Sequence, residues 1–402
     1  MDVQKIRRDF PLLQGNGKKS VVYFDTACQS LRPNVVMESI DQYYKTISAC
    51  GGRSMHHLAA EVSRAVDQAR TTVAKFINAP RKEEVVFLRN TTEGINLVAN
   101  SLSFKPGDTI LLSDKEHNSN LIPWQRLAQR KGLQLKRVPS TPDNTFDLDA
   151  YRSLLDGQVR LVALGFTSNL DGTTIPAEEV VRLAHQNGSL VLLDGAQTLP
   201  HLPVNVKALD VDFLAFSGHK MLGPSGTGVL YAKYPLLEEM DPFLVGGDTV
   251  ASSTYDSCEF LPPPEKFEAG LQDYAGIMGL GAAVKYLQGI GFDFIQKQER
   301  LINECLTQGL KDIPGLKIIG PQDAKLRGGM FTFYLEGIDS HRVALMLDQM
   351  AGILVRSGQH CVHSWFHAHQ IPGSVRASAY FYNTLEEAEL LVSNLTKIRK
   401  VL

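Results

Sequence analysis

The sequence predicts an α/β protein with a mostly parallel sheet, followed by a smaller α+β unit. Helical patterns alternate with short apolar runs from about residue 60 to 235, and these runs lack the polar alternation of a strand with one wet face. Strands buried on both faces are typical of parallel sheets covered by helices. The predicted strands are Glu84–Leu88, Thr109–Leu112, Gln158–Phe166, Leu190–Leu193 and Phe213–Phe216, and the predicted helices are Ala59–Ile77, Ser119–Lys131 and Pro176–Gln186.

A different pattern begins near residue 260. Three consecutive prolines in Phe260–Lys266 indicate a connector. Two long helical patterns follow, and then short strands alternate with helices to the end of the chain. These segments are Gly276–Gln288, Asp293–Gly309, Gly328–Leu335, His341–Met350, Ile353–Arg356, Ser374–Tyr380 and Leu385–Lys397. We therefore predict an N-terminal segment over 1–14, a large domain over 15–260 and a small domain over 261–402.

Composition excludes several classes of protein. The 402 residues include 41 Lys and Arg against 43 Asp and Glu, so a net charge of −2 draws the chain to neither nucleic acid nor an anionic membrane. No apolar run approaches the roughly 18 residues that span a bilayer, and Met1–Phe10 lacks the apolar stretch of a secretory signal. Five widely spaced cysteines indicate free thiols in a reducing compartment. We expect a cytoplasmic protein.

A carboxylate and a lysine follow two successive predicted strands. Asp194 comes directly after Leu190–Leu193, and Lys220 follows Phe213–Phe216 and precedes a glycine-rich stretch. A buried lysine can form an imine with an aldehyde, and a carboxylate can pair with a cationic ring nitrogen. Pyridoxal phosphate (PLP) requires both groups. The spacing therefore predicts a PLP site, whereas either residue alone would be an ordinary turn aspartate or surface lysine.

Two further turns offer polar groups near this pair. Thr91 and Thr92 lie where the strand Glu84–Leu88 meets a helix, so they suit either a phosphate site or an N-cap. His117 follows the strand Thr109–Leu112, where an imidazole could stack on a cofactor ring and transfer protons. A lone loop histidine is more often unremarkable, so only its position favours the functional interpretation.

The loop after Ile353–Arg356 carries a candidate nucleophile. Cys361 lies in a glycine-containing loop beside arginine and histidine, which favours a reactive thiolate. Arg376, fifteen residues later, could hold a substrate carboxylate through two hydrogen bonds. A purely structural role in packing suits Cys305, within its predicted helix, better than it suits Cys361.

These motifs together resemble those of the class V aminotransferase-like, fold-type I PLP enzymes, and most closely the Suf-type (group II) cysteine desulfurases, with the selenocysteine lyases nearby. The resemblance extends from Tyr23–Ala27 to Tyr382–Thr384 and keeps the order and spacing of the motifs. It implies a homodimer in which the large domain has a seven-stranded, mostly parallel sheet and the small domain carries the catalytic cysteine. It also implies conversion of L-cysteine to L-alanine with a persulfide on Cys361, supplying sulfur for iron–sulfur clusters or thio-cofactors through an acceptor or scaffold protein.

The resemblance implies a role for each matching residue. Lys220 would hold PLP and shuttle the α-proton, Asp194 would pair with the pyridinium nitrogen, and Gln197 would bond to the phenolic oxygen. His117 would stack on the ring, and Arg376 would anchor the substrate carboxylate. The phosphate would be bound by Thr91, Thr92, Ser217 and His219, and the other substrate-side residues would be Asn169, Arg356, Arg53 and His56.

Departures from the family pattern leave more than one function open. Leu271 replaces a threonine that would reach the partner subunit's cofactor phosphate, and Gln272 could compensate. Cys28 and Cys50 are unusual additions that could share a pocket with Cys361, either as a persulfide relay or, with the nearby His363, as a metal or iron–sulfur site. Two different enzymes also fit the sequence: a selenocysteine lyase acting on L-selenocysteine, and a class V lyase or epimerase in which Cys361 is incidental.

Overall fold

The computed structural model describes residues 1–15 and 21–401. Its larger sheet has seven strands in the order β2-β8-β7-β6-β5-β3-β4. These are β2 (Val85–Leu88), β3 (Thr109–Ser113), β4 (Gln134–Val138), β5 (Val159–Gly165), β6 (Leu190–Asp194), β7 (Phe213–Ser217) and β8 (Gly228–Ala232). Neighbours from β7 to β4 pair in parallel, whereas β8 pairs antiparallel with both β2 and β7. The predicted mostly parallel sheet is confirmed.

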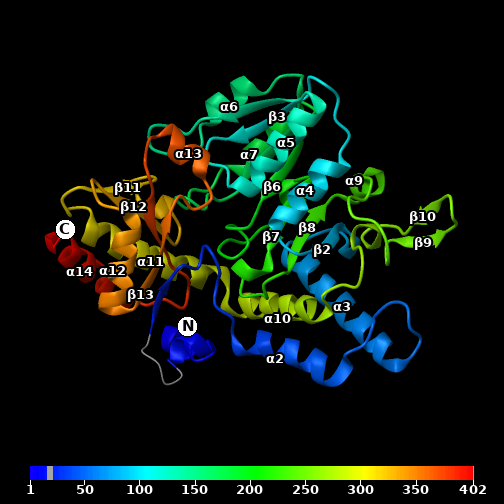
Figure 1. The fold of residues 1–402 in the computed structure, drawn as a ribbon, viewed down its shortest axis with the longest axis horizontal. Coiled ribbons are helices and arrows are strands. Elements are labelled where there is room, and N and C mark those ends of the chain that lie inside the picture. The colour runs from blue at the N-terminus through cyan, green and yellow to red at the C-terminus, as the bar shows by residue number, and fades with distance from the viewer. Residues whose placement is uncertain (16–20, 402) are drawn as a thin grey trace.

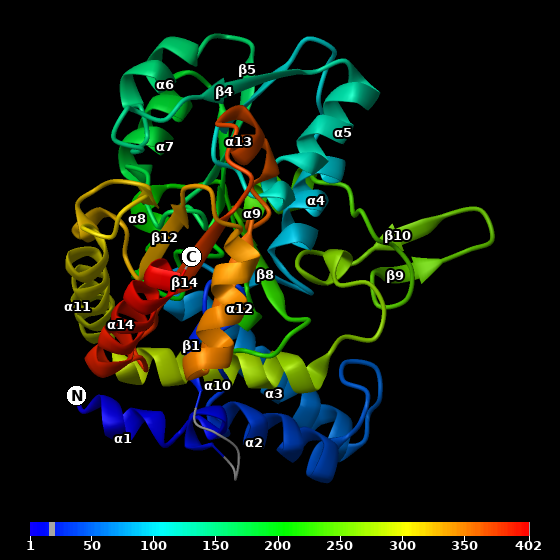
Figure 2. The ribbon, with the colours of Figure 1, turned by 60° about the vertical axis from the view of Figure 1, so that its left-hand side comes forward.

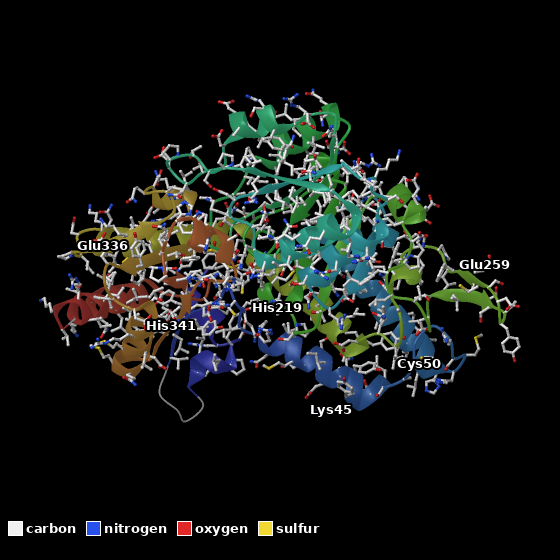
Figure 3. The ribbon with its side chains drawn as sticks, turned by 45° about the horizontal axis from the view of Figure 1, so that its top comes forward. Lys45, Cys50, His219, Glu259, Glu336 and His341 are labelled. Atoms are coloured by element: carbon white, nitrogen blue, oxygen red, sulfur yellow. The ribbon has the colours of Figure 1, made fainter. Side chains whose placement is uncertain are left out.

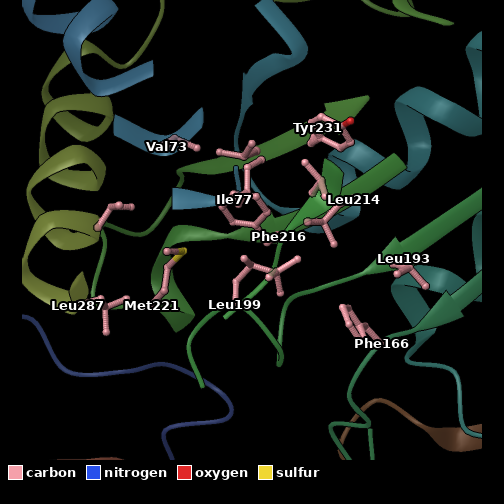
Figure 4. Close-up of a cluster of buried hydrophobic side chains, with 14 of the residues drawn as sticks. Val73, Ile77, Phe166, Leu193, Leu199, Leu214, Phe216, Met221, Tyr231 and Leu287 are labelled. Carbon is pink, nitrogen blue, oxygen red and sulfur yellow. The ribbon is translucent and has the colours of Figure 1, made fainter. Parts of the chain in front are cut away.

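Helices cover both faces of this sheet, because its strands are apolar on both sides. In β6, Val191 and Leu193 belong to one core cluster and Leu192 belongs to the other. Figure 4 shows part of the first cluster, where Leu193 and Leu287 come from the sheet and a helix. The first face carries α3 (His57–Phe76), α6 (Leu148–Leu154), α7 (Ala177–Gln186), α8 (Val206–Leu209) and α10 (Tyr274–Ile290); the second carries α4 (Thr91–Ser101), α5 (Ile122–Lys131) and α9 (Tyr234–Glu239).

A smaller sheet packs against a third core. It contains β1 (Val22–Phe24), β11 (Leu316–Ile319), β12 (Met330–Leu335), β13 (Ile353–Gly358) and β14 (Ser374–Ser378), in the order β1-β13-β14-β12-β11. Its core includes side chains of α11 (Phe292–Leu310), α12 (Ser340–Ala351) and α14 (Leu385–Val401). Figures 1 and 2 show this unit on the side of the molecule opposite the hairpin of β9 (Val250–Ser253) and β10 (Cys258–Phe260). A short helix, α13 (His363–Ala368), follows the loop after β13.

The remaining elements connect these units. Helices α1 (Val3–Arg7) and α2 (Asn34–Gln42) lie below α10 in Figure 2. The short 3₁₀ and π segments are Pro11–Gln14, Tyr43–Ile47, Lys82–Glu84, Asn118–Asn120, Gly218–Lys220, Glu265–Phe267 and Ala324–Leu326. Strand β1, near the N-terminus, pairs with β13 of the smaller sheet. Helix α10, which follows the β9–β10 hairpin in the sequence, packs in the first core cluster with the large sheet. The two units therefore interleave at both ends of the large one. The domain division at residues 14 and 260 stays a prediction. Among the helices of the described chain, none is long and apolar enough to cross a membrane.

Candidate functional site

A cavity of about 220 Å³ opens at the carboxyl ends of the parallel strands, where the small unit meets the large sheet. Segments that follow β3, β5, β6 and β7 contribute to its wall, and β13 and β14 add two arginines. Most of the predicted site residues therefore meet in one place. Those that line the cavity are Thr91, Thr92, His117, Asn169, Asp194, Gln197, Ser217, His219, Lys220, Arg356 and Arg376, together with Cys28.

Lys220 and Asp194 form the charged centre of the cavity. Asp194 ends β6 and is only 8% exposed, and its Oδ1 accepts a hydrogen bond from the amide of Ala196 at 3.0 Å. Burial lowers the pKa of Lys220 although Asp194 opposes the shift, and burial raises the pKa of Asp194 although Lys220 opposes it. A lysine whose ammonium form is disfavoured has a larger fraction of free amine. This is the property that imine formation requires.

Hydroxyl groups gather at the start of α4. The amide of Thr91 donates to Oγ of Ser217 at 2.8 Å, and the hydroxyl oxygens of these two residues are 2.6 Å apart. Thr92 lies 2.8 Å from the hydroxyl of Ser119. The N-cap is Asn90, whose side chain accepts from an amide of the first turn, so neither threonine serves as the cap. Thr91 and Thr92 line the cavity at a helix N-terminus that favours an anion such as phosphate.

Two side chains test whether the cavity suits an aromatic cofactor. Burial, with Lys220 and both cavity arginines nearby, lowers the pKa of His117 to about 3, so its ring is neutral and suited to stacking. Its Nδ1 accepts from the amide of Ser119 at 3.1 Å. Gln197 donates from Nε2 to the carbonyl of Ala27 at 2.7 Å, while its buried Oε1 has no partner among the described residues. An orphaned polar atom on a residue that lines the same cavity as Lys220 fits a polar cofactor such as PLP.

Arg376 is the most deeply buried cation of the cavity, at 1% exposed. Its Nη1 donates to the carbonyl of Asn169 at 2.7 Å, and its Nη2 lies 3.7 Å from Oδ1 of Asp25. Within the described chain, Nε and Nη2 have no hydrogen-bond acceptor. Burial lowers the pKa of Arg376 to about 10, which still leaves it charged at neutral pH. A buried arginine with two free donors is suited to bind a carboxylate.

Cys361 lies at the edge of the cavity, not among the residues that line it. It sits in a loop of left-handed backbone, with φ of 48° at His360 and 60° at Cys361. The amide of Asn118 donates to the carbonyl of Cys361 at 2.8 Å, and Nδ2 of Asn169 donates to the carbonyl of His360 at 2.7 Å. Contacts from two other loops thus hold a conformation that non-glycine residues adopt at a cost, as is common at functional sites.

Besides Cys361, four predicted residues are absent from the lining of this cavity. Arg53 forms an ion pair with Asp248, and His56 caps α3 by accepting from the amide of Ala59 at 3.2 Å. Cys50 is well separated from His219 in Figure 3. His363 lies on α13, with its Nδ1 2.8 Å from Nδ2 of Asn118. Nowhere in residues 1–15 and 21–401 do three His, Cys, Asp or Glu side chains gather as a metal site requires.

Sequence reasoning did not assign roles to two further cavity residues, Glu116 and His360. Glu116 is 2% exposed and accepts from Ser113, Asn120 and the amide of Gly165. Burial raises the pKa of Glu116 to about 7 and lowers that of His360 to about 2. Each is the chain neighbour of a predicted site residue, which is the one signal that could have identified it.

Comparison with known proteins explains the arrangement. Residues 22–391 match the family model described as "Aminotransferase class-V". The chain belongs to this family. Class V aminotransferases depend on PLP, and the cavity around Lys220 and Asp194 fits that cofactor. One solved structure of similar fold, a C-DES variant 25% identical with a TM-score of 0.82 over 97% of this chain and 98% of its own, carries glycine covalently linked to PLP.

Relatives of the chain are named as cysteine desulfurases. A probable cysteine desulfurase of Streptomyces coelicolor is 40% identical over 99% of this chain and 97% of its own length. A cysteine desulfurase of Escherichia coli O139:H28 is 40% identical over 100% of this chain and 99% of its own. The apo structure of a cysteine desulfurase from Thermococcus onnurineus superposes with a TM-score of 0.95 at 37% identity, covering 99% of this chain and 98% of its own.

Proposed function

We propose that this protein is a PLP-dependent cysteine desulfurase, which converts L-cysteine to L-alanine and retains the sulfur as a persulfide on Cys361. The observation that carries the proposal is the cavity lined by the half-buried Lys220, the buried Asp194 and Arg376 with its two free donors, with Cys361 at its edge. The full-length similarity to proteins named cysteine desulfurase supports it.

The residues that would hold PLP are those of the large sheet. Lys220 would bind it covalently, Asp194 would pair with the ring nitrogen, and Gln197 would bond to the ring oxygen. His117, being neutral, would cover one face of the ring without adding charge. The phosphate would be bound by Thr91, Thr92, Ser217 and His219. PLP supplies an electron sink, which weakens the bond between the β-carbon and the sulfur of cysteine.

The side chains around the substrate have separate tasks. Arg376 would bind the carboxylate through Nε and Nη2, and Asn169 would position Arg376 through its carbonyl. Lys220 would accept and return the α-proton at Nζ, and its lowered pKa favours the free amine that accepts a proton. Cys361 would attack the sulfur of the substrate: a sulfur–sulfur bond forms as the carbon–sulfur bond breaks. Arg356 would stabilise the charge on sulfur, since its Nη2 donates to Sγ of Cys361 at 3.6 Å.

The proposal includes a homodimer and a sulfur-acceptor or scaffold protein for iron–sulfur or thio-cofactor assembly in the cytoplasm. Exposed apolar side chains around the β9–β10 hairpin support an interface there, namely Phe243, Leu244, Val245, Phe260 and Leu271. Leu271 is 68% exposed in the single chain. The side-chain amide of Gln272 donates to carbonyls of Ala269 and Gly270, so Gln272 is occupied within its own turn.

The test is to give L-cysteine to the purified holoenzyme and measure alanine, sulfide and the mass of the Cys361 peptide. We expect alanine and a gain of about 32 Da, one sulfur atom, at Cys361. Cys361→Ala should abolish cysteine turnover. If that variant still releases alanine from L-cysteine, or the Cys361 peptide never gains sulfur, the proposal is wrong. If the same variant still turns over L-selenocysteine, the selenocysteine lyase reaction does not require the thiol of Cys361.

A further inference from the structure

A second thiol lies beside Cys361. Arg356 donates from Nη1 to Sγ of Cys28 at 2.9 Å and from Nη2 to Sγ of Cys361 at 3.6 Å. Both cysteines are free and partly buried. Because Nη1 and Nη2 are attached to the same carbon of one planar guanidinium, a single side chain holds the two sulfur atoms near each other.

The small sheet produces this juxtaposition. Strand β1 pairs in parallel with β13, so the turn after β1 reaches the same end of the sheet as Arg356 near the end of β13. That turn is closed by a hydrogen bond from the amide of Cys28 to the carbonyl of Asp25 at 3.1 Å. Cys28 lines the cavity, whereas Cys361 lies at its edge. Arg356 therefore connects an inner thiol with an outer one.

We propose that Cys28 is a second sulfur carrier that takes sulfur from the persulfide of Cys361. This inference rests on the proposed function, because that reaction supplies the donor persulfide. The thiolate of Cys28 attacks the terminal sulfur, the sulfur–sulfur bond to Cys361 breaks as one to Cys28 forms, and Cys361 leaves as a thiolate that gains the proton Cys28 lost. The transferred sulfur keeps its oxidation state, so the step needs neither oxidant nor reductant.

Arg356 is placed to assist this exchange. Negative charge moves from one sulfur to the other during the attack, and an N–H donor of the same cation points at each of them. The exchange regenerates the Cys361 thiol for another substrate molecule. A chain without an acceptor protein should therefore carry two sulfur atoms.

The remaining cysteines lack this geometry. Cys258 is exposed on β10, Cys305 packs beside the third core cluster, and Cys50 hydrogen-bonds to the carbonyl of Gly51 at 3.5 Å. Cys258 provides a matched control, because a thiol open to solvent would gain sulfur by unspecific exchange at least as readily as Cys28.

The experiment mixes holoenzyme with L-cysteine in the absence of reductant and acceptor, traps thiols with an alkylating agent, and measures alanine and the masses of the cysteine peptides. We expect about two alanines per chain, with sulfur on both Cys361 and Cys28 and none on Cys258. Cys28→Ser and Cys28→Ala should each give about one alanine and sulfur on Cys361 alone. Cys258→Ser should match the parent protein, and Cys361→Ser should leave Cys28 without sulfur.

Several outcomes would overturn the inference. Alanine formation with sulfur on Cys361 but never on Cys28 would refute it while leaving the proposed function intact. Sulfur on Cys28 in the Cys361→Ser variant would show direct attack on substrate, and equal labelling of Cys258 would show unspecific exchange. A Cys28–Cys361 disulfide with released sulfide would show that Cys28 attacks the inner sulfur instead. Absence of alanine in the parent protein would reject the proposed function itself.

Discussion

The two free donors of Arg376 allow a quantitative test of how the substrate is held. Arg376→Lys keeps a positive charge but removes the planar fork that can bond to both oxygens of a carboxylate. Because Nη1 already bonds to Asn169, Nε and Nη2 remain for the substrate. Loss of one charge-assisted hydrogen bond costs about 1.5–3 kcal/mol, which corresponds to roughly a 10- to 150-fold decrease in kcat/KM.

The assay is alanine formation over a range of L-cysteine concentrations, and we expect most of the loss to appear as a higher KM. Arg327→Lys is the matched control: Arg327 is 0% exposed and also has two nitrogens without partners in the described chain, but it bonds to Asn303 and Thr307 of α11. This control should lower the melting temperature without raising KM. An unchanged KM in Arg376→Lys, or an equal rise in Arg327→Lys, would refute the reasoning.

Three further predictions concern stability. Glu268→Ala should cost about 3–5 kcal/mol by chemical denaturation, because it leaves the buried guanidinium of Arg70 without the carboxylate that it contacts at 2.6 Å. Burial lowers the pKa of His360 to about 2, so below about pH 6.5 the unfolded chain binds a proton that the folded chain does not. Stability should fall as the pH decreases, and His360→Gln should reduce the slope near pH 5 by about 1.4 kcal/mol per pH unit. Gly172→Ala should lower the melting temperature strongly, because its φ is 76° and a Cβ would lie 1.9 Å from the carbonyl oxygen of Arg327.

Each of these has a control or a contrary result. Glu179→Ala removes the partner of the exposed Arg182 and should change stability little, so an equal loss would argue against burial as the cause. Gly188 has a φ of 77° with open space around it, and Gly188→Ala should cost less than Gly172→Ala. An unchanged slope in His360→Gln would show that the imidazole is already charged in the folded protein.

The fold was predictable from the sequence wherever burial determines the pattern of apolar residues. Leu190–Leu193 and Phe213–Phe216 are apolar on both sides and appear as the central strands β6 and β7. Strand β4 was not predicted, because it lies at the edge of the sheet, where only Val138 of its five residues is buried and the sequence Gln134–Arg137 is largely polar. Strand β8 was not predicted either, because a glycine-rich stretch directly precedes it. Its antiparallel direction depends on pairing with β2 and β7.

The site was predictable for a related reason. Side chains that follow parallel strands converge at one edge of a sheet, so Asp194, Lys220 and His117 had to approach each other. Contacts between the large and the small unit, in contrast, follow no regular spacing in the sequence. The hydrogen bond from Arg356 to Cys28 joins residues 328 positions apart, and it depends on β1 pairing with a sheet whose other strands come after residue 310. The ion pair of Arg53 with Asp248 likewise depends on a loop contact that sequence spacing does not indicate.

Asn169 links the two halves of the proposed reaction. Its carbonyl accepts from Arg376, and its side-chain amide donates to the carbonyl of His360, each at 2.7 Å. A substrate carboxylate that draws Arg376 toward the cavity would therefore act, through one residue, on the left-handed loop that carries Cys361. Since left-handed conformations at non-glycine residues persist only where surrounding contacts hold them, the loop depends on this hydrogen bond and on the one from Asn118. The position of the proposed nucleophile is thus tied to the arginine proposed to bind the substrate.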